Sequence, residues 1–89
     1  MAYEAVENTE PRDRPGAPVE VRVLATCDTE DEAIEVARHA RDAYVGTGRH
    51  DYTWWLVREP GLTLARWIAD SSTSKEFVLD LRTGELVEN

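Results

Sequence analysis

The sequence predicts a two-layer α+β fold, in which one mostly antiparallel sheet of four to five strands carries a single helix on one face. One segment shows the apolar spacing of an amphipathic helix, and several short segments are rich in β-branched and aromatic residues. Glycine and proline separate the short segments, as is typical of turns. The expected order is β-α-β-β-β, within one domain over 19–89.

Residues 1–18 are expected to form a disordered N-terminal tail. This segment holds three of the four prolines together with several charged residues, and it shows no apolar periodicity. A segment of this composition buries too little apolar surface to offset the entropy lost on ordering. The folded domain is therefore expected to begin at Val19.

The first strand is expected over 19–27, where apolar residues alternate with others. Alternation of this kind indicates a strand with one buried face, because successive side chains point to opposite sides of a sheet. Four residues are predicted to share the buried face: Val19, Val21, Val23 and Ala25.

The helix is expected over 30–44. Thr29 is a suitable N-cap, because its hydroxyl can accept a hydrogen bond from the first turn, and Glu32 completes a capping box. Alanines recur at helical spacing and predict a face that packs closely on the sheet. Gly46 is expected to end the helix in the left-handed conformation.

The segment 52–69 holds all three tryptophans and is predicted to be a hairpin. Pro60 and Gly61 suit a type II turn, since proline presets its own φ and glycine accepts the positive φ that follows. Trp54 and Trp55 are adjacent, so in a strand their side chains point to opposite faces. The sequence leaves open which of the two faces the core.

A further strand is expected over 76–82, and Gly84 lies in a tight turn that leads to a short final strand. Three apolar residues of the 76–82 strand are predicted to face the core: Phe77, Leu79 and Leu81.

The net charge of −8 argues against a nucleic-acid partner, which would require a basic surface to neutralise phosphates. Six acidic residues against two arginines give residues 28–44 half of this excess. A solvated helix face is the ordinary interpretation. The alternative is an acidic regulator that mimics nucleic acid and binds a basic protein through Glu30, Asp31, Glu32, Glu35 and Asp42.

A cytoplasmic protein without a membrane partner is expected. No apolar run approaches the roughly 20 residues needed to cross a bilayer, and the N-terminus has no secretory signal pattern. The single cysteine, Cys27, cannot form an internal disulfide. Cys27, His39 and His50 match no metal-ligand spacing, so neither metal nor cofactor is expected.

Catalytic candidates are His50 and Asp51 in a glycine-containing connector, and Cys27 directly before the predicted helix. Loops often carry functional residues, and a helix N-terminus lowers the pKa of a nearby thiol. Adjacent His-Asp pairs are nevertheless common by chance, and no third partner is apparent. A small enzyme or ligand-binding protein that uses this connector is therefore the alternative hypothesis.

The main hypothesis is a non-catalytic interaction or accessory protein. One helix covers only one face of such a sheet, so a tryptophan is expected on the other face, where water contact is costly. We expect this face to bind another protein or a second copy, as a homodimer. Tryptophan and arginine are enriched at the energetic centres of interfaces, so the expected anchors are Trp54, Trp55, Arg58, Arg66 and Trp67.

Overall fold

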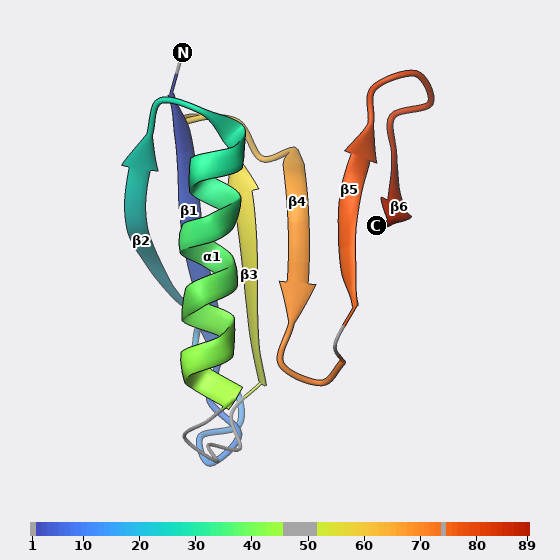
Figure 1. Cartoon of the computed structure of the whole chain (residues 1–89). Coiled ribbons are helices and arrows are strands. Elements are labelled where there is room, and N and C mark those ends of the chain that lie inside the picture. The colour runs from blue at the N-terminus through green and yellow to red at the C-terminus, as the bar shows by residue number, and fades with distance from the viewer. Residues whose placement is uncertain (1, 46–51, 74) are drawn as a thin grey trace.

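The computed structural model describes residues 2–45, 52–73 and 75–89, which form one helix on one face of a six-stranded antiparallel sheet (Figure 1). The elements are β1 (Tyr3–Glu10), β2 (Glu20–Cys27), α1 (Glu30–Val45), β3 (Tyr52–Arg58), β4 (Ala65–Asp70), β5 (Glu76–Asp80) and β6 (Glu85–Glu88). Across the sheet the strand order is β2-β1-β3-β4-β5-β6. The predicted α+β class, with one antiparallel sheet and one helix, is confirmed.

The sheet has six strands, rather than four to five, because the N-terminal segment contributes β1. The expectation of a disordered tail is wrong for Tyr3–Glu10, which lies between β2 and β3 and pairs antiparallel with both. Ala5 and Val6 are fully buried on opposite sides of this strand. Charged residues dilute the apolar signal of β1, but ladders on both edges satisfy its backbone hydrogen bonds.

The helix α1 begins as the sequence predicts. Thr29 Oγ1 accepts a hydrogen bond from the Glu32 backbone N–H at 3.2 Å. Small residues on the sheet-facing side, Ala33 and Ala37, are fully buried and allow close packing on the sheet. At the other end of the helix, the Tyr44 ring meets a tryptophan of β3 edge to face. The expected helix end at Gly46 lies outside the described residues.

The β3–β4 hairpin forms with the predicted turn, but its second strand begins at Ala65 rather than at about residue 62. Leu62 N donates to Glu59 O at 3.1 Å, which closes the turn, and Gly61 has a φ of +82°. A positive φ of this kind is the conformation that glycine adopts without steric cost.

The edge strand β2 does not present its valines to the core. Val6 lies opposite Val23, and the pairing then skips Leu24, which forms a bulge. Ala25 consequently turns toward the helix side. The valines before the bulge lie on the other face and are 42%, 58% and 46% exposed: Val19, Val21 and Val23. The prediction that they are buried is wrong, because alternation reveals two faces but not which one is covered.

The carboxylate of Glu76 joins α1, β4 and β5. It accepts hydrogen bonds from Arg38 Nη2 at 2.7 Å and Nε at 2.9 Å, from Arg41 Nη1 at 3.3 Å and from the buried Trp67 indole N–H at 3.1 Å. The bonds from Arg38 lower the pKa of Glu76 to about 2; burial opposes this shift, and the Trp67 bond and the arginine charges reinforce it.

Glu76→Gln should lower stability most above about pH 5. The pKa of Glu76 falls from its ordinary 4.5 to about 2 on folding, so its contribution is complete above 4.5 and is lost as the pH falls toward 2. After allowance for solvent screening, we expect the wild type to lose about 2 kcal/mol more than the variant across this window. Urea unfolding at several pH values measures the difference. Glu85→Gln, on exposed β6, is the matched control, and parallel curves for Glu76→Gln and wild type would contradict the role of this carboxylate.

Removal of residues 1–10 should abolish cooperative folding, because β2 and β3 both lose the strand that joins them. Thermal unfolding followed by circular dichroism is the measurement, and a chain that lacks only residues 1–2 is the control. A sharp transition in the shorter chain would show that β1 is dispensable.

Candidate interaction surface

The alternation of β3 settles which of the adjacent tryptophans faces the core. Trp55 is fully buried against α1, and so are Thr53 and Val57, two residues away on either side. Trp54 therefore points to the opposite side of the sheet, away from the helix. We call this side of the sheet the open face.

An apolar row crosses five strands of the open face. Residues directly opposite one another in paired strands project to the same side, so the row follows from the register. Its members, from β2 to β5, are Val23, Val6, Leu56, Ile68 and Phe77. No charged residue interrupts these positions, and Glu88 of β6 follows Phe77 at the end.

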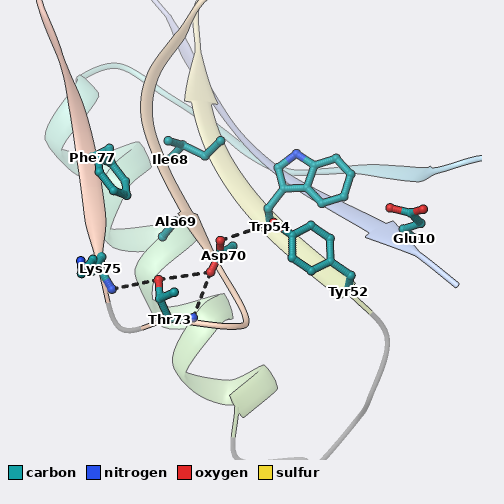
Figure 2. Close-up of a pocket in the computed structure, with 9 residues that line it drawn as sticks. All are labelled: Glu10, Tyr52, Trp54, Ile68, Ala69, Asp70, Thr73, Lys75 and Phe77. Carbon is teal, nitrogen blue, oxygen red and sulfur yellow. Dashed lines mark hydrogen bonds between the residues drawn. The ribbon is translucent and has the colours of Figure 1, made fainter. Parts of the chain in front are cut away.

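A hollow of about 340 Å³ lies beside the apolar row, at the Trp54 end of the open face. Figure 2 shows Tyr52 and Trp54 on one side of it and Phe77 on the other, with Ile68 between them. The Tyr52 and Trp54 ring centroids are 5.4 Å apart, with the rings tilted by 39°. The full lining consists of Glu10, Tyr52, Trp54, Ile68, Ala69, Asp70, Thr73, Lys75 and Phe77.

Asp70 supplies a fixed negative charge to this hollow. Its Oδ1 accepts hydrogen bonds from the backbone and hydroxyl groups of Ser72 and Thr73 at 3.0–3.3 Å, and its Oδ2 accepts from Tyr52 OH at 3.3 Å. Burial raises the pKa of Asp70, but the Ser72 and Thr73 bonds outweigh it and lower the pKa below its usual value. Burial and the Asp70 charge raise the pKa of Tyr52. At neutral pH the pair thus holds one negative charge.

Asn8 leaves a buried donor unsatisfied on the open face. It lies opposite Trp54 in the register and is only 7% exposed. Its Nδ2 has no hydrogen-bond partner among the residues that the structure describes. A buried unpaired donor of this kind is costly to the folded state.

The five anchors expected from the sequence do not lie together. Trp55 and Trp67 are fully buried in the core beneath α1, so neither can contact a partner of the folded chain directly. Trp54 and Arg58 lie on the open face, where Arg58 Nε is 3.4 Å from Glu4 Oε1.

Arg66 lies on the helix side. A register shift between Val57 and Arg58 places it there, and its Nε pairs with Glu30 at 3.3 Å. Its guanidinium also lies 6.0 Å from the Tyr3 ring. This ion pair attaches the start of the helix to β4.

Most of the apolar row was not identified as a surface by sequence reasoning. Phe77 and Leu79 were predicted to face the core, but the register places Phe77 on the open face with Ile68, and Val78 on the helix side with Trp67. Leu79 shares the side of Phe77, and Leu81 is 72% exposed beyond the strand. The prediction that these three residues face the core is therefore wrong. The alternation in β5 indicates that Phe77 and Leu79 share one side and Val78 lies on the other, but only the register shows which side the helix covers.

The chemical candidates from the sequence do not form a site in the described residues. His50 and Asp51 lie outside them. Cys27 ends β2 and packs against the core, and His39 is exposed on α1. Among the described side chains, no group of three or more His, Cys, Asp or Glu residues is arranged to hold a metal ion. No helix in the described ranges is long and apolar enough to cross a membrane.

The acidic helix face is partly neutralised within the chain. Besides the Glu30–Arg66 pair, Glu35 accepts a hydrogen bond from Arg38, and Asp42 lies 3.4 Å from Arg41. These arginines reduce the negative charge available to a basic partner.

Comparison with protein-family models, with curated proteins and with solved structures finds no match to this chain. The open face, with its apolar row and the hollow beside it, is the basis for the functional proposal below.

Proposed function

We propose that the protein is a non-catalytic interaction domain that binds through its open face, with a second copy of the chain as partner. The observation that carries this proposal is the uninterrupted apolar row from Val23 to Phe77. Val6 is already buried within the chain, but the other four members of the row are partly or largely exposed, and contact with a partner would remove them from water as the helix does on the other side.

The size of the open face suits a stable interface. Six strands about 4.8 Å apart, each with about six residues at about 3.3 Å, give a projected area on the order of 600 Å². Because side chains project from the sheet, the solvent-accessible area of the open face is larger than this projected area. A standard interface buries about 800 Å² per partner. The open face therefore has the area that one isologous dimer needs.

The distribution of charge favours a second copy. The apolar row is uncharged, so two chains of net charge −8 can meet there without opposing like charges directly. Arg58 lies at one end of β3, and the Asp70 carboxylate lies beside the other end. A two-fold axis along the apolar row would bring Arg58 of each copy toward the Trp54 and Asp70 end of the other, where cation–π and ionic attraction act together.

Trp54→Glu should weaken self-association by at least tenfold, because it places a charge in the contact and removes a large apolar surface from each copy. Light scattering behind a sizing column, over a concentration range, measures the mass against the 10.1 kDa chain. Leu64→Glu is the matched control, because Leu64 is exposed in the β3–β4 connection and the substitution adds the same charge.

The near-ultraviolet circular dichroism of Trp55 and Trp67 should persist in Trp54→Glu, since both rings lie in the core. Wild-type protein that runs as a single chain at every concentration would refute self-association, and an equal effect of Leu64→Glu would refute the open face as its location.

A second candidate is that the hollow binds a small organic cation. Three aromatic rings line it, together with two carboxylates (Glu10 and Asp70) and one ammonium group (Lys75). A cation in the hollow would therefore lie near aromatic rings and a net negative charge. Titration with benzyltrimethylammonium, followed by NMR, should shift the Trp54 indole signal and leave that of Trp67 in place. Unchanged Trp54 signals at millimolar concentration would remove this candidate.

A further inference from the structure

The outer edge of β2 is a second surface with features of an interface. In the part of the chain that the structure describes, β2 has a neighbouring strand on one side only, namely β1 (Figure 1). The first four residues of β2, from Glu20 to Val23, are all exposed. An edge strand of eight residues presents a row of unpaired backbone N–H and C=O groups, which favours pairing with another strand.

Two features limit where another strand can pair. Pro18 has no N–H to donate, so it ends a ladder on one side. The bulge at Leu24 interrupts the regular geometry on the other side. The stretch between them is 19–23, and its middle residue is Val21.

This stretch is complementary to itself when it runs antiparallel to a second copy centred on Val21. Glu20 then lies opposite Arg22 of the other copy, and Val19 lies opposite Val23. A centre at residue 20 or 22 would instead set two glutamates or two arginines directly opposite each other, which is destabilising. Charge therefore selects one register.

Ion pairs within each chain extend this pattern. Arg22 Nη2 lies 3.3 Å from Glu7 Oε2 on β1, and Glu20 Oε1 lies 3.2 Å from Arg14 Nη2. Pairing about Val21 would continue them into one row of alternating sign: Glu7 and Arg22 of one copy, then Glu20 and Arg14 of the other. Exposed ion pairs of this kind contribute little affinity, but they oppose other registers.

We propose that β2 is a self-complementary interaction edge, through which two copies pair β2 to β2 in antiparallel orientation about Val21 and form one continuous sheet. The two-fold axis is perpendicular to the sheet, so the edge pairing leaves both open faces on the same side and uncovered. This contact is distinct from the proposed open-face dimer and does not depend on it.

Cysteine cross-linking tests the register. Opposed Cα atoms in antiparallel strands are about 4.5–5.5 Å apart, within the range of about 4.4–6.8 Å that disulfides bridge. In a Cys27→Ser background, Val21→Cys should form disulfide dimers under mild oxidation. Val19→Cys, the matched control, should not cross-link to itself, because the same residue on the other copy lies four positions away. An equimolar mixture of Val19→Cys and Val23→Cys chains should cross-link.

Charge exchange provides a second test, in a Trp54→Glu background that removes the open-face contact. Glu20→Arg and Arg22→Glu should each weaken association at least tenfold, measured by light scattering. An equimolar mixture of the two should restore it, since each arginine again meets a glutamate across the pair. If Val21→Cys stays uncross-linked, if Val19→Cys cross-links as readily, or if the mixture does not recover, the proposal is wrong. Loss of Val21→Cys cross-linking in the Trp54→Glu background would show that the edge depends on the open face.

Discussion

One helix on a six-stranded sheet is the constraint on which the rest of this structure depends. The 16 residues of α1 give a helix about 24 Å long and about 10 Å wide, whereas six strands span about 29 Å across the sheet. The helix packs over β1, β2 and β3, reaches β4 only slightly, and leaves β5 and β6 without a cover (Figure 1). On the opposite side of the sheet, the apolar residues lie away from the helix: Val6 is fully buried there, while Leu56, Ile68 and Phe77 are partly exposed.

Polar contacts hold the structure together where apolar packing ends. The small buried residues Ala33 and Ala37 allow α1 to lie close to the central strands, but they offer no reach toward β5. The Glu76 carboxylate spans that distance by accepting from Arg38 and Arg41 on the helix and from the Trp67 indole. A buried indole N–H and two arginines thus share one acceptor, which makes this cluster sensitive to the protonation of a single group.

The open face and the outer edge of β2 are both surfaces that no other described element of the chain covers. A second helix would have covered the apolar row, and a longer or bulkier neighbour would have covered β2. The described residues include neither, so the hollow beside Trp54 and the charge pattern of Glu20 and Arg22 lie where another molecule can reach them. Association by face and by edge would use two perpendicular directions, and both can operate in one assembly.

Local patterns in the sequence determined the fold class, the helix start at Thr29, the turn at Gly61 and the presence of a tryptophan on each side of β3. Each depends on residues within a few positions of one another. The tertiary structure alone decided that Tyr3–Glu10 forms a strand inside the sheet, that Trp54 rather than Trp55 faces outward, and that the valines of β2 and Phe77 lie on the open face. These outcomes depend on strand register and on which side the helix covers. Both are set by pairing between distant segments, and two bulges shift that pairing by one residue and so reverse the side to which a residue points.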